Sequence, residues 1–134
     1  MKKCVIYTDG GARGNPGPAG IGVVIQDAGK TVKELSKYIG KATNNQAEYA
    51  ALILGLEEAR ELGAREIEIV MDSELIVKQV KREYRVKDPE LAARYVQVVN
   101  LLQQFDDYII RHVVREKNIK ADALVNKALD SRLG

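Results

Sequence analysis

The sequence of 134 residues predicts an α/β fold, a five-stranded mixed sheet flanked by helices. In the first third of the chain, three apolar segments are separated by glycine-rich or short connections, as in antiparallel strands. Further along, apolar strand-like segments alternate with segments of helical periodicity, as in parallel strands joined by helices. A chain of this length buries roughly two thirds of its unfolded surface. We therefore expect a single domain over residues 1–134.

The first three strands are predicted from apolar runs bounded by turn residues. They are expected at residues 4–8, 20–26 and 31–39. Residues 10–20 are rich in glycine and proline and are predicted to be a loop, and residues 27–30 form a short hairpin connection. Cys4, the only cysteine, is then a small strand residue.

The second part of the chain is predicted to contain four helices and two strands. A helix over residues 45–62 ends at Gly63, since glycine suits the position after a helix end. Pro89 suits a helix start. The remaining elements are a strand at 66–71, a helix at 73–81, an irregular segment at 83–88, a helix at 90–105, a strand at 108–114 and a helix at 119–129.

Four carboxylates are predicted to meet at one edge of this sheet. The first strand runs into Asp9, and two reversals of direction bring the start of the next helix, with Glu48, to the same edge. A strand parallel to the first ends in Asp72, and the helix after the last strand carries Asp122 in its first turn. Ligands of open α/β sheets favour this edge. If the first and fourth strands are neighbours, they lie roughly 4.8 Å apart, and Asp9 and Asp72 can bridge a cation.

Converging carboxylates repel one another strongly unless a cation neutralises them. Oxygen ligands suit hard ions such as Mg²⁺ or Mn²⁺, and two such ions suit an in-line displacement at phosphate. His112 is the only histidine, so no histidine–cysteine cluster offers zinc a site. We interpret His112 as a half-buried residue of the last strand.

Each carboxylate also has a structural interpretation. Asp9 followed by Gly10 is a common hairpin turn. Glu48 can close a capping box with Asn45, and Asp72 can cap the helix that follows it. Asp122 suits a helix amino terminus because of the helix dipole.

With these residues identified, the chain resembles type 1 ribonuclease H. The resemblance rests on TDGGARGNPGPAG at 8–20, TNNQAEYAAL at 43–52, MDSELIV at 71–77 and REKNIKADALVNKAL at 115–129. It implies the ribonuclease H-like fold with strand order 3-2-1-4-5. It also implies metal-dependent endonucleolytic cleavage of the RNA strand of RNA/DNA hybrids, giving 5′-phosphate and 3′-hydroxyl ends. The catalytic and metal-binding residues, with two ions of Mg²⁺ or Mn²⁺, would be Asp9, Glu48, Asp72 and Asp122.

The resemblance further implies contacts in the minor groove of the hybrid, where 2′-hydroxyls distinguish RNA from DNA. Backbone groups near glycine and side-chain amides can pair with these hydroxyls, and Thr43 would contact a DNA phosphate. The candidates are Gly10, Gly11, Asn15, Thr43, Asn44, Asn45 and Gln46. Turn geometry for the glycines and helix capping for the asparagines are the alternatives, and both roles can coexist.

The chain departs from many family members in three ways. The connection at 115–118 has no histidine, and Arg115 there can steady charge but cannot shuttle a proton near neutral pH. Tryptophan is absent, and Tyr84 lies in a basic stretch, KQVKREYRVK at 78–87, that is either a phosphate-binding handle or a solvated helix end. No separate hybrid-binding domain is evident, so affinity for the hybrid is expected to be modest and salt-dependent.

Two other functions remain open at this stage: a non-catalytic hybrid-binding module and another nuclease on the same fold. The single cysteine fits a reducing compartment, residues 1–9 do not form a signal peptide, and no apolar run approaches the length of a membrane span. We therefore expect a cytoplasmic monomer that binds RNA/DNA hybrids and no membrane.

Overall fold

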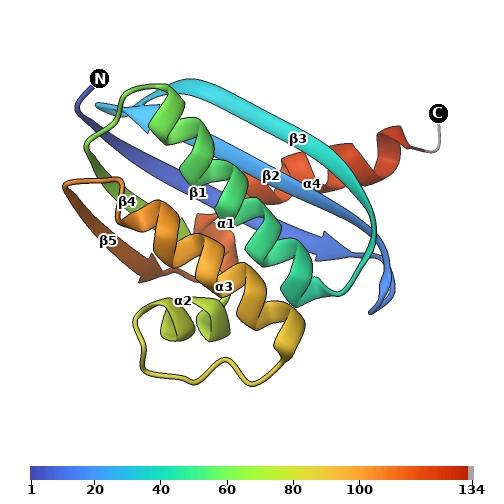
Figure 1. Cartoon of the computed structure of the whole chain (residues 1–134). Helices are drawn as coiled ribbons and strands as arrows, with labels where there is room; N and C mark the ends of the chain where they lie inside the picture. The colour runs from blue at the N-terminus through green and yellow to red at the C-terminus, as the bar shows by residue number, and fades with distance from the viewer. Residues whose placement is uncertain (133–134) are drawn as a thin grey trace.

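The structure is a computed structural model that describes residues 1–132; the last two residues of the predicted 1–134 domain lie outside the described part. It contains one five-stranded sheet in the order β3-β2-β1-β4-β5, which confirms the predicted order. β1 is antiparallel to β2 and β2 to β3, whereas β1, β4 and β5 are parallel. Figure 1 shows α1 and α3 across one face of the sheet and α4 behind the other.

The elements follow the predicted sequence of strands and helices. The strands are β1 (Lys3–Ala12), β2 (Gly17–Asp27), β3 (Lys30–Ala42), β4 (Glu66–Met71) and β5 (Asp107–His112). The helices are α1 (Asn44–Glu61), α2 (Glu74–Val80), α3 (Pro89–Leu102) and α4 (Ile119–Ser131), with a 3₁₀ turn, η1 (Arg115–Lys117), before α4.

The prediction of a loop over residues 10–20 was wrong. β1 continues past Asp9, which pairs with Gly22 of β2, and the ladder extends to Ala12 opposite Ala19. The glycine after Asp9 is explained by packing rather than by a turn. A Cβ atom on Gly10 would lie 2.3 Å from the carbonyl carbon of Ala47, so only glycine lets α1 approach the strand this closely. Asp9 therefore lies within a strand and is not a hairpin corner.

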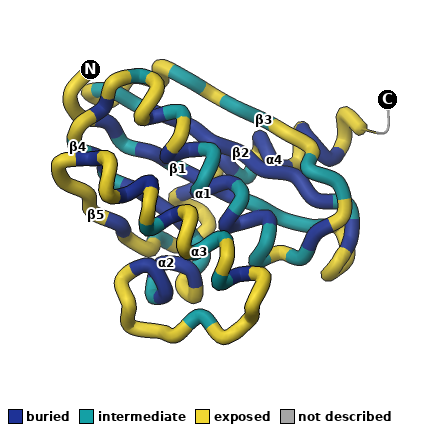
Figure 2. The backbone as a smooth tube through the Cα atoms, in the orientation of Figure 1, coloured by how far each residue is buried: buried dark blue, intermediate teal, exposed yellow. Residues whose placement is uncertain are grey.

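The core lies mainly between the sheet and the helices α1 and α3. Its fully buried side chains include Ile6 of β1, Leu52 of α1 and Ile69 of β4. Figure 2 shows the buried stretches concentrated in the sheet and on the helix faces turned toward it. Cys4 is a buried strand residue, as predicted.

On the opposite face, α4 packs closely on β2. A Cβ atom on Gly22 would lie 2.3 Å from the carbonyl oxygen of Ala121. This contact fixes the first turn of α4 against the strand that pairs with β1, and the next residue in that turn is Asp122. The absent side chain at Gly22 thereby brings Asp122 toward Asp9.

The last strand also differs from the expectation. It ends at His112, two residues before the predicted end, and His112 is exposed rather than half-buried. β5 lies at an edge of the sheet, so its side chains have a neighbouring strand on one side only. Within residues 1–132, no helix combines the length and the apolar character needed to cross a lipid bilayer.

Candidate active site

The four predicted carboxylates line one cavity of about 470 Å³ near the carboxyl ends of β1 and β4. Asp9 comes from β1, Glu48 from α1, Asp72 from the end of β4 and Asp122 from α4. Sequence segments more than a hundred residues apart thus meet at one edge of the sheet, as their strand directions predict.

Three of these side chains form a compact cluster. Asp9, Glu48 and Asp72 each present one carboxylate oxygen within 4.8 Å of the others. The backbone amide of Gly10 donates to Oδ1 of Asp9 at 3.0 Å and to Oε1 of Glu48 at 2.9 Å. Asp9 is 7% exposed and Glu48 is 9% exposed, so the cluster is largely shielded from water. All its ligand atoms are oxygens, the donors that hard divalent cations prefer.

Without a bound cation, the surroundings of the cluster disfavour the ionised form of its buried carboxylates. Burial, followed by the nearby charges of Asp72 and Asp122, raises the pKa of Asp9 to about 8. Burial and the charges of Asp9 and Asp72 raise the pKa of Glu48 well above its ordinary value. The amide of Gly10 acts in the opposite direction on both groups, but it does not offset the loss of solvation. A bound cation would remove this cost, because it would stabilise both carboxylates in their ionised form.

The structure decides against two of the structural interpretations. Thr43 caps α1, with its Oγ1 accepting from the amide of Gln46 and the Gln46 side chain accepting from the Thr43 amide. Glu48 is therefore not part of a capping box. Ser73 caps α2 through its Oγ, so Asp72 is not the cap of that helix. Both carboxylates project into the cavity without a capping role.

Asp122 stands apart from the compact cluster. It lies in the first turn of α4, where the helix dipole favours it, as expected. Nη2 of Arg115 lies 3.2 Å from its Oδ1, and both residues line the same cavity. Asp122 is also close enough to Asp9 to contribute to the raised pKa of that residue. It can therefore act together with the cluster while remaining paired to an exposed cation.

Asn118 is a residue of this site that the sequence prediction missed. It is 2% exposed, and its Nδ2 donates to the backbone carbonyl of Thr8 at 2.9 Å. Its backbone carbonyl oxygen accepts from the amide of Asp122 at 3.1 Å. Asn118 thus ties the start of α4 to the residue before Asp9. Nothing in the local pattern marked it, because the carbonyl it binds belongs to a strand 110 positions away.

The predicted substrate-contacting residues lie beside the cavity and hold each other in place. Oδ1 of Asn44 accepts from the amide of Ala12 at 2.9 Å, and the amide of Asn44 donates to Oδ1 of Asn15 at 3.0 Å. These bonds join the end of β1, the turn after it and the start of α1. Gly10, Gly11 and Asn44 line the cavity. Asn45 is half-buried in the first turn of α1.

Comparison with known proteins agrees with this geometry. A family model described as reverse transcriptase-like matches residues 7–128. A ribonuclease H of Pseudomonas fluorescens is 33% identical over 143 residues, which cover 96% of this chain and 93% of that protein. The chain belongs to the ribonuclease H family. A ribonuclease HI of Halobacterium salinarum is 49% identical over 125 residues, or 92% of this chain and 63% of that protein.

Solved structures of ribonuclease H share the fold over the whole chain. A ribonuclease H1 isolated from compost by a metagenomic approach is 50% identical, with a TM-score of 0.94 and complete (100%) coverage of both chains. The same enzyme has been solved in complex with an RNA/DNA hybrid, with a TM-score of 0.93, 49% identity and coverage of 98% and 99%. A bifunctional protein of Mycobacterium tuberculosis is 47% identical over 131 residues, and the chain spans only 36% of its length.

Two segments singled out in the sequence are also placed by the structure. The connection before α4 is the 3₁₀ turn η1, which holds Arg115 and no histidine. The basic stretch after α2 holds Tyr84, which is 48% exposed. Nζ of Lys78 donates to the Tyr84 hydroxyl at 3.3 Å and lies 4.9 Å from the ring centroid, so the ring is held by a cation.

Proposed function

We propose that this chain is a metal-dependent endoribonuclease that hydrolyses the RNA strand of RNA/DNA hybrids, leaving 5′-phosphate and 3′-hydroxyl ends. The observation that carries the proposal is the cluster of Asp9, Glu48 and Asp72, whose oxygens lie within 4.8 Å of one another. Membership of the ribonuclease H family and the hybrid complex of the compost enzyme support the choice of substrate.

The proposed cofactor is a pair of Mg²⁺ or Mn²⁺ ions. The donor set fits them, since it consists of carboxylate oxygens whose burial makes the metal-free charged state costly. Asp9, Glu48, Asp72 and Asp122 are the proposed catalytic residues that would hold the ions. Such ions, when bound, supply activation of the attacking water and stabilisation of the leaving oxygen.

The protein's own groups then have separate roles. Gly10 orients Asp9 and Glu48 through one shared amide, so both carboxylates face the cavity before any substrate arrives. Asn118 holds the first turn of α4, and hence Asp122, against β1. Arg115 steadies negative charge beside Asp122. Because its guanidinium stays protonated, it does not act as a general acid or base near neutral pH.

The substrate contacts are proposed in the minor groove of the hybrid. The Oδ1 atoms of Asn15 and Asn44 are already engaged, so their Nδ2 groups are the donors left for 2′-hydroxyls. Gln46 likewise keeps its Nε2 as a donor, because its Oε1 accepts from Thr43. Asn45 and the backbone of Gly10 and Gly11 complete this surface, and Thr43 is proposed to contact a DNA phosphate.

Tyr84 is proposed as part of a small phosphate-binding surface. The stretch from Lys78 to Lys87 contains five basic residues, and one of them, Lys78, is partly neutralised by Glu74 at 2.9 Å. The exposed ring of Tyr84 can pack on a sugar or a base of the hybrid. We further propose that the chain acts as a monomer in the cytoplasm, where its one buried thiol stays reduced.

The deciding experiment is cleavage of one end-labelled RNA/DNA hybrid beside matched RNA/RNA and DNA/DNA duplexes. Each duplex is incubated without divalent metal, with Mg²⁺ and with Mn²⁺. The wild type is compared with Asp9→Asn and with Asp106→Asn as a matched control, because Asp106 forms an exposed ion pair with Arg65 outside the site. We expect metal-dependent cleavage of the RNA strand of the hybrid, lost in Asp9→Asn and retained in Asp106→Asn.

Other outcomes identify the competing functions. Hybrid binding without cleavage in any metal, by a folded protein, would favour the non-catalytic binding module. Cleavage of a DNA duplex at a comparable rate would favour another nuclease on the same fold. If Asp9→Asn cleaves the hybrid as fast as the wild type does, the carboxylate cluster is not the active site.

A further inference from the structure

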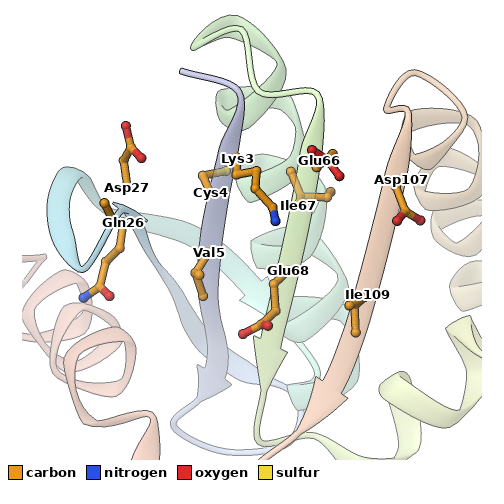
Figure 3. A pocket seen from close by; sticks show the side chains of 11 residues that line it. Lys3, Cys4, Val5, Gln26, Asp27, Glu66, Ile67, Glu68, Asp107 and Ile109 are labelled. Carbon is orange, nitrogen blue, oxygen red and sulfur yellow. The ribbon is translucent and has the colours of Figure 1, made fainter.

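The sheet has an uncovered half on the face that carries α4. That helix packs on β2, as the close approach of Ala121 to Gly22 shows, and it also lies against β3 and β1. Val70, at the end of β4 nearest the candidate active site, is buried, whereas Glu66 and Glu68 of β4 and the side chains of β5 on this face are half-buried or exposed. Figure 3 shows the strands β1, β4 and β5 side by side with these side chains projecting from them.

Strand register arranges these side chains in rows. Val5, Glu68 and Ile109 form one row across β1, β4 and β5. Lys3, Glu66 and Asp107 form the row beside it, nearer the start of the strands, and the corner is completed by Asp27 at the end of β2. Together they line a pocket of about 480 Å³ (Figure 3). Ile109 is 58% exposed.

The pocket carries more negative than positive charge. Glu68 is paired with Arg111, whose Nη2 lies 3.1 Å from its Oε2. Three other carboxylates, those of Asp27, Glu66 and Asp107, line the pocket with one ammonium group, that of Lys3. Among the ion pairs of residues 1–132, none within 4.0 Å involves these three carboxylates. An apolar floor with an acidic rim is therefore open to solvent.

We infer that this pocket is a docking site for a basic peptide segment of a protein partner. One apolar side chain of the segment would cover Val5 and Ile109, and lysine or arginine side chains on either side would pair with Asp27, Glu66 and Asp107. Charge complementarity selects this occupant, because the surplus carboxylates attract cationic groups and repel the phosphates of a nucleic acid.

The pocket and the candidate active site lie toward opposite ends of the strands. The pocket is formed at the start of β1, β4 and β5, whereas Asp9 and Asp72 lie at or near the ends of β1 and β4. Asp9 lies four positions after Val5 along β1, which corresponds to roughly 13 Å of extended chain. A partner can therefore occupy the pocket without blocking a hybrid at the carboxylates, and it would bring the nuclease to a site rather than inhibit it.

Fluorescence anisotropy can test this inference with a labelled pentapeptide in which one leucine is flanked on each side by two lysines. We expect saturable binding to the wild type that weakens as salt is added. Ile109→Lys and the double variant Glu66→Gln/Asp107→Asn should each weaken it on the order of tenfold. Glu57→Gln/Glu61→Gln, which removes two exposed charges from α1, is the matched control and should bind as the wild type does.

Several results would overturn the inference. The first is the absence of saturable binding to the wild type. The second is that a peptide with glutamates in place of the lysines binds as tightly as the lysine peptide. The third is that the pocket variants bind the lysine peptide as tightly as the wild type does. Loss of binding in Asp9→Asn/Asp72→Asn would place the peptide at the catalytic carboxylates instead. Sedimentation that shows wild-type dimers, dissociated by Ile109→Lys, would assign the pocket to a second copy of this chain. We expect the pocket variants to cleave the hybrid at the wild-type rate. Cleavage therefore tests the proposed function independently of peptide binding to the pocket.

Discussion

Asp9 and Glu48 accept hydrogen bonds from the same backbone amide, that of Gly10, at 3.0 and 2.9 Å. One donor thus fixes two carboxylates that come from different elements and repel each other. The arrangement requires α1 to lie almost against β1, which the missing side chain at position 10 permits. The predictions below follow from this shared amide and from the groups around it.

Replacing Asp9 by asparagine should stabilise the metal-free protein at high pH. The pKa of Asp9 is raised to about 8, so between about pH 4 and pH 8 the folded protein keeps a proton that the unfolded chain has lost. The stability that this proton supports is fully present below about pH 4 and declines as the pH rises through about 8. Thermal unfolding in the presence of a chelator should therefore show that Asp9→Asn raises the melting temperature above that of the wild type by more at pH 9 than at pH 5. An equal increase in melting temperature at both pH values would contradict the raised pKa.

Divalent metal should stabilise the wild type more than it stabilises Asp9→Asn. Bound Mn²⁺ or Mg²⁺ would neutralise the cluster of Asp9, Glu48 and Asp72, and a ligand that binds only the folded state raises the melting temperature. At a metal concentration about 100 times the dissociation constant, the free energy of unfolding rises by about 2.7 kcal/mol. Scanning calorimetry over a metal titration at pH 8 measures this increase in stability. Asp106→Asn should respond like the wild type, and a similar response from Asp9→Asn would argue against this site.

Gly10→Ala should destabilise the fold and abolish cleavage. The added Cβ atom would lie 2.3 Å from the Ala47 carbonyl group, so α1 must move away from β1 and Glu48 must move with it. Forcing an extra carbon into a packed contact costs about 1–3 kcal/mol. Gly11→Ala is the control for stability, since its Cβ atom would meet only Val125 at 3.7 Å. Urea unfolding of both variants measures the difference, and equal stability would show that α1 can shift freely.

Asn118→Ala should lower both stability and cleavage. It leaves the buried carbonyl of Thr8 without the hydrogen bond at 2.9 Å, which costs about 1–3 kcal/mol. It also releases the start of α4, so Asp122 is held less firmly and more metal is needed for half-maximal cleavage. Lys120→Ala, on the exposed side of the same turn, is the control. A stability loss with an unchanged metal requirement would mean that Asn118 supports the fold alone.

Arg115→Ala should reduce cleavage only moderately. The ion pair with Asp122 is exposed, and such pairs contribute about 0–1 kcal/mol, or less than about a tenfold change in rate. Arg115→Lys should keep most of the wild-type cleavage rate if the positive charge is what matters. It should keep less of that rate if the planar guanidinium group is needed. Steady-state kinetics with a fixed hybrid distinguish the two. A loss as large as that of Asp9→Asn would show that Arg115 takes a direct part in the chemistry.

Several features of this protein could be predicted from the sequence because they depend on local order and direction. The alternation of strands and helices and the helix start at Pro89 agree with the structure, as does the strand order that the family resemblance implied. The meeting of Asp9, Glu48, Asp72 and Asp122 also followed, because strand direction alone determines which edge of a sheet a residue occupies.

Other features depended on contacts between distant segments. The glycines after Asp9 resembled a turn, but Gly10 is required by the approach of α1, which no local pattern reveals. The capping box belongs to Thr43 and Gln46, which left Glu48 free for the site. Asn118 was not predicted because its partner, Thr8, lies at the other end of the chain.

The sequence by itself determined the order of strands and helices and the edge of the sheet where the carboxylates meet, since periodicity and chain direction are properties of neighbouring residues. The resemblance of its four motifs indicated the family and the strand order. The tertiary structure alone decided which groups the carboxylates contact, how deeply they are buried and which half of the sheet stays open. Those properties depend on how closely helices pack on strands. Packing distances at Gly10 and Gly22 are set by atoms that are far apart in the sequence and adjacent only after folding.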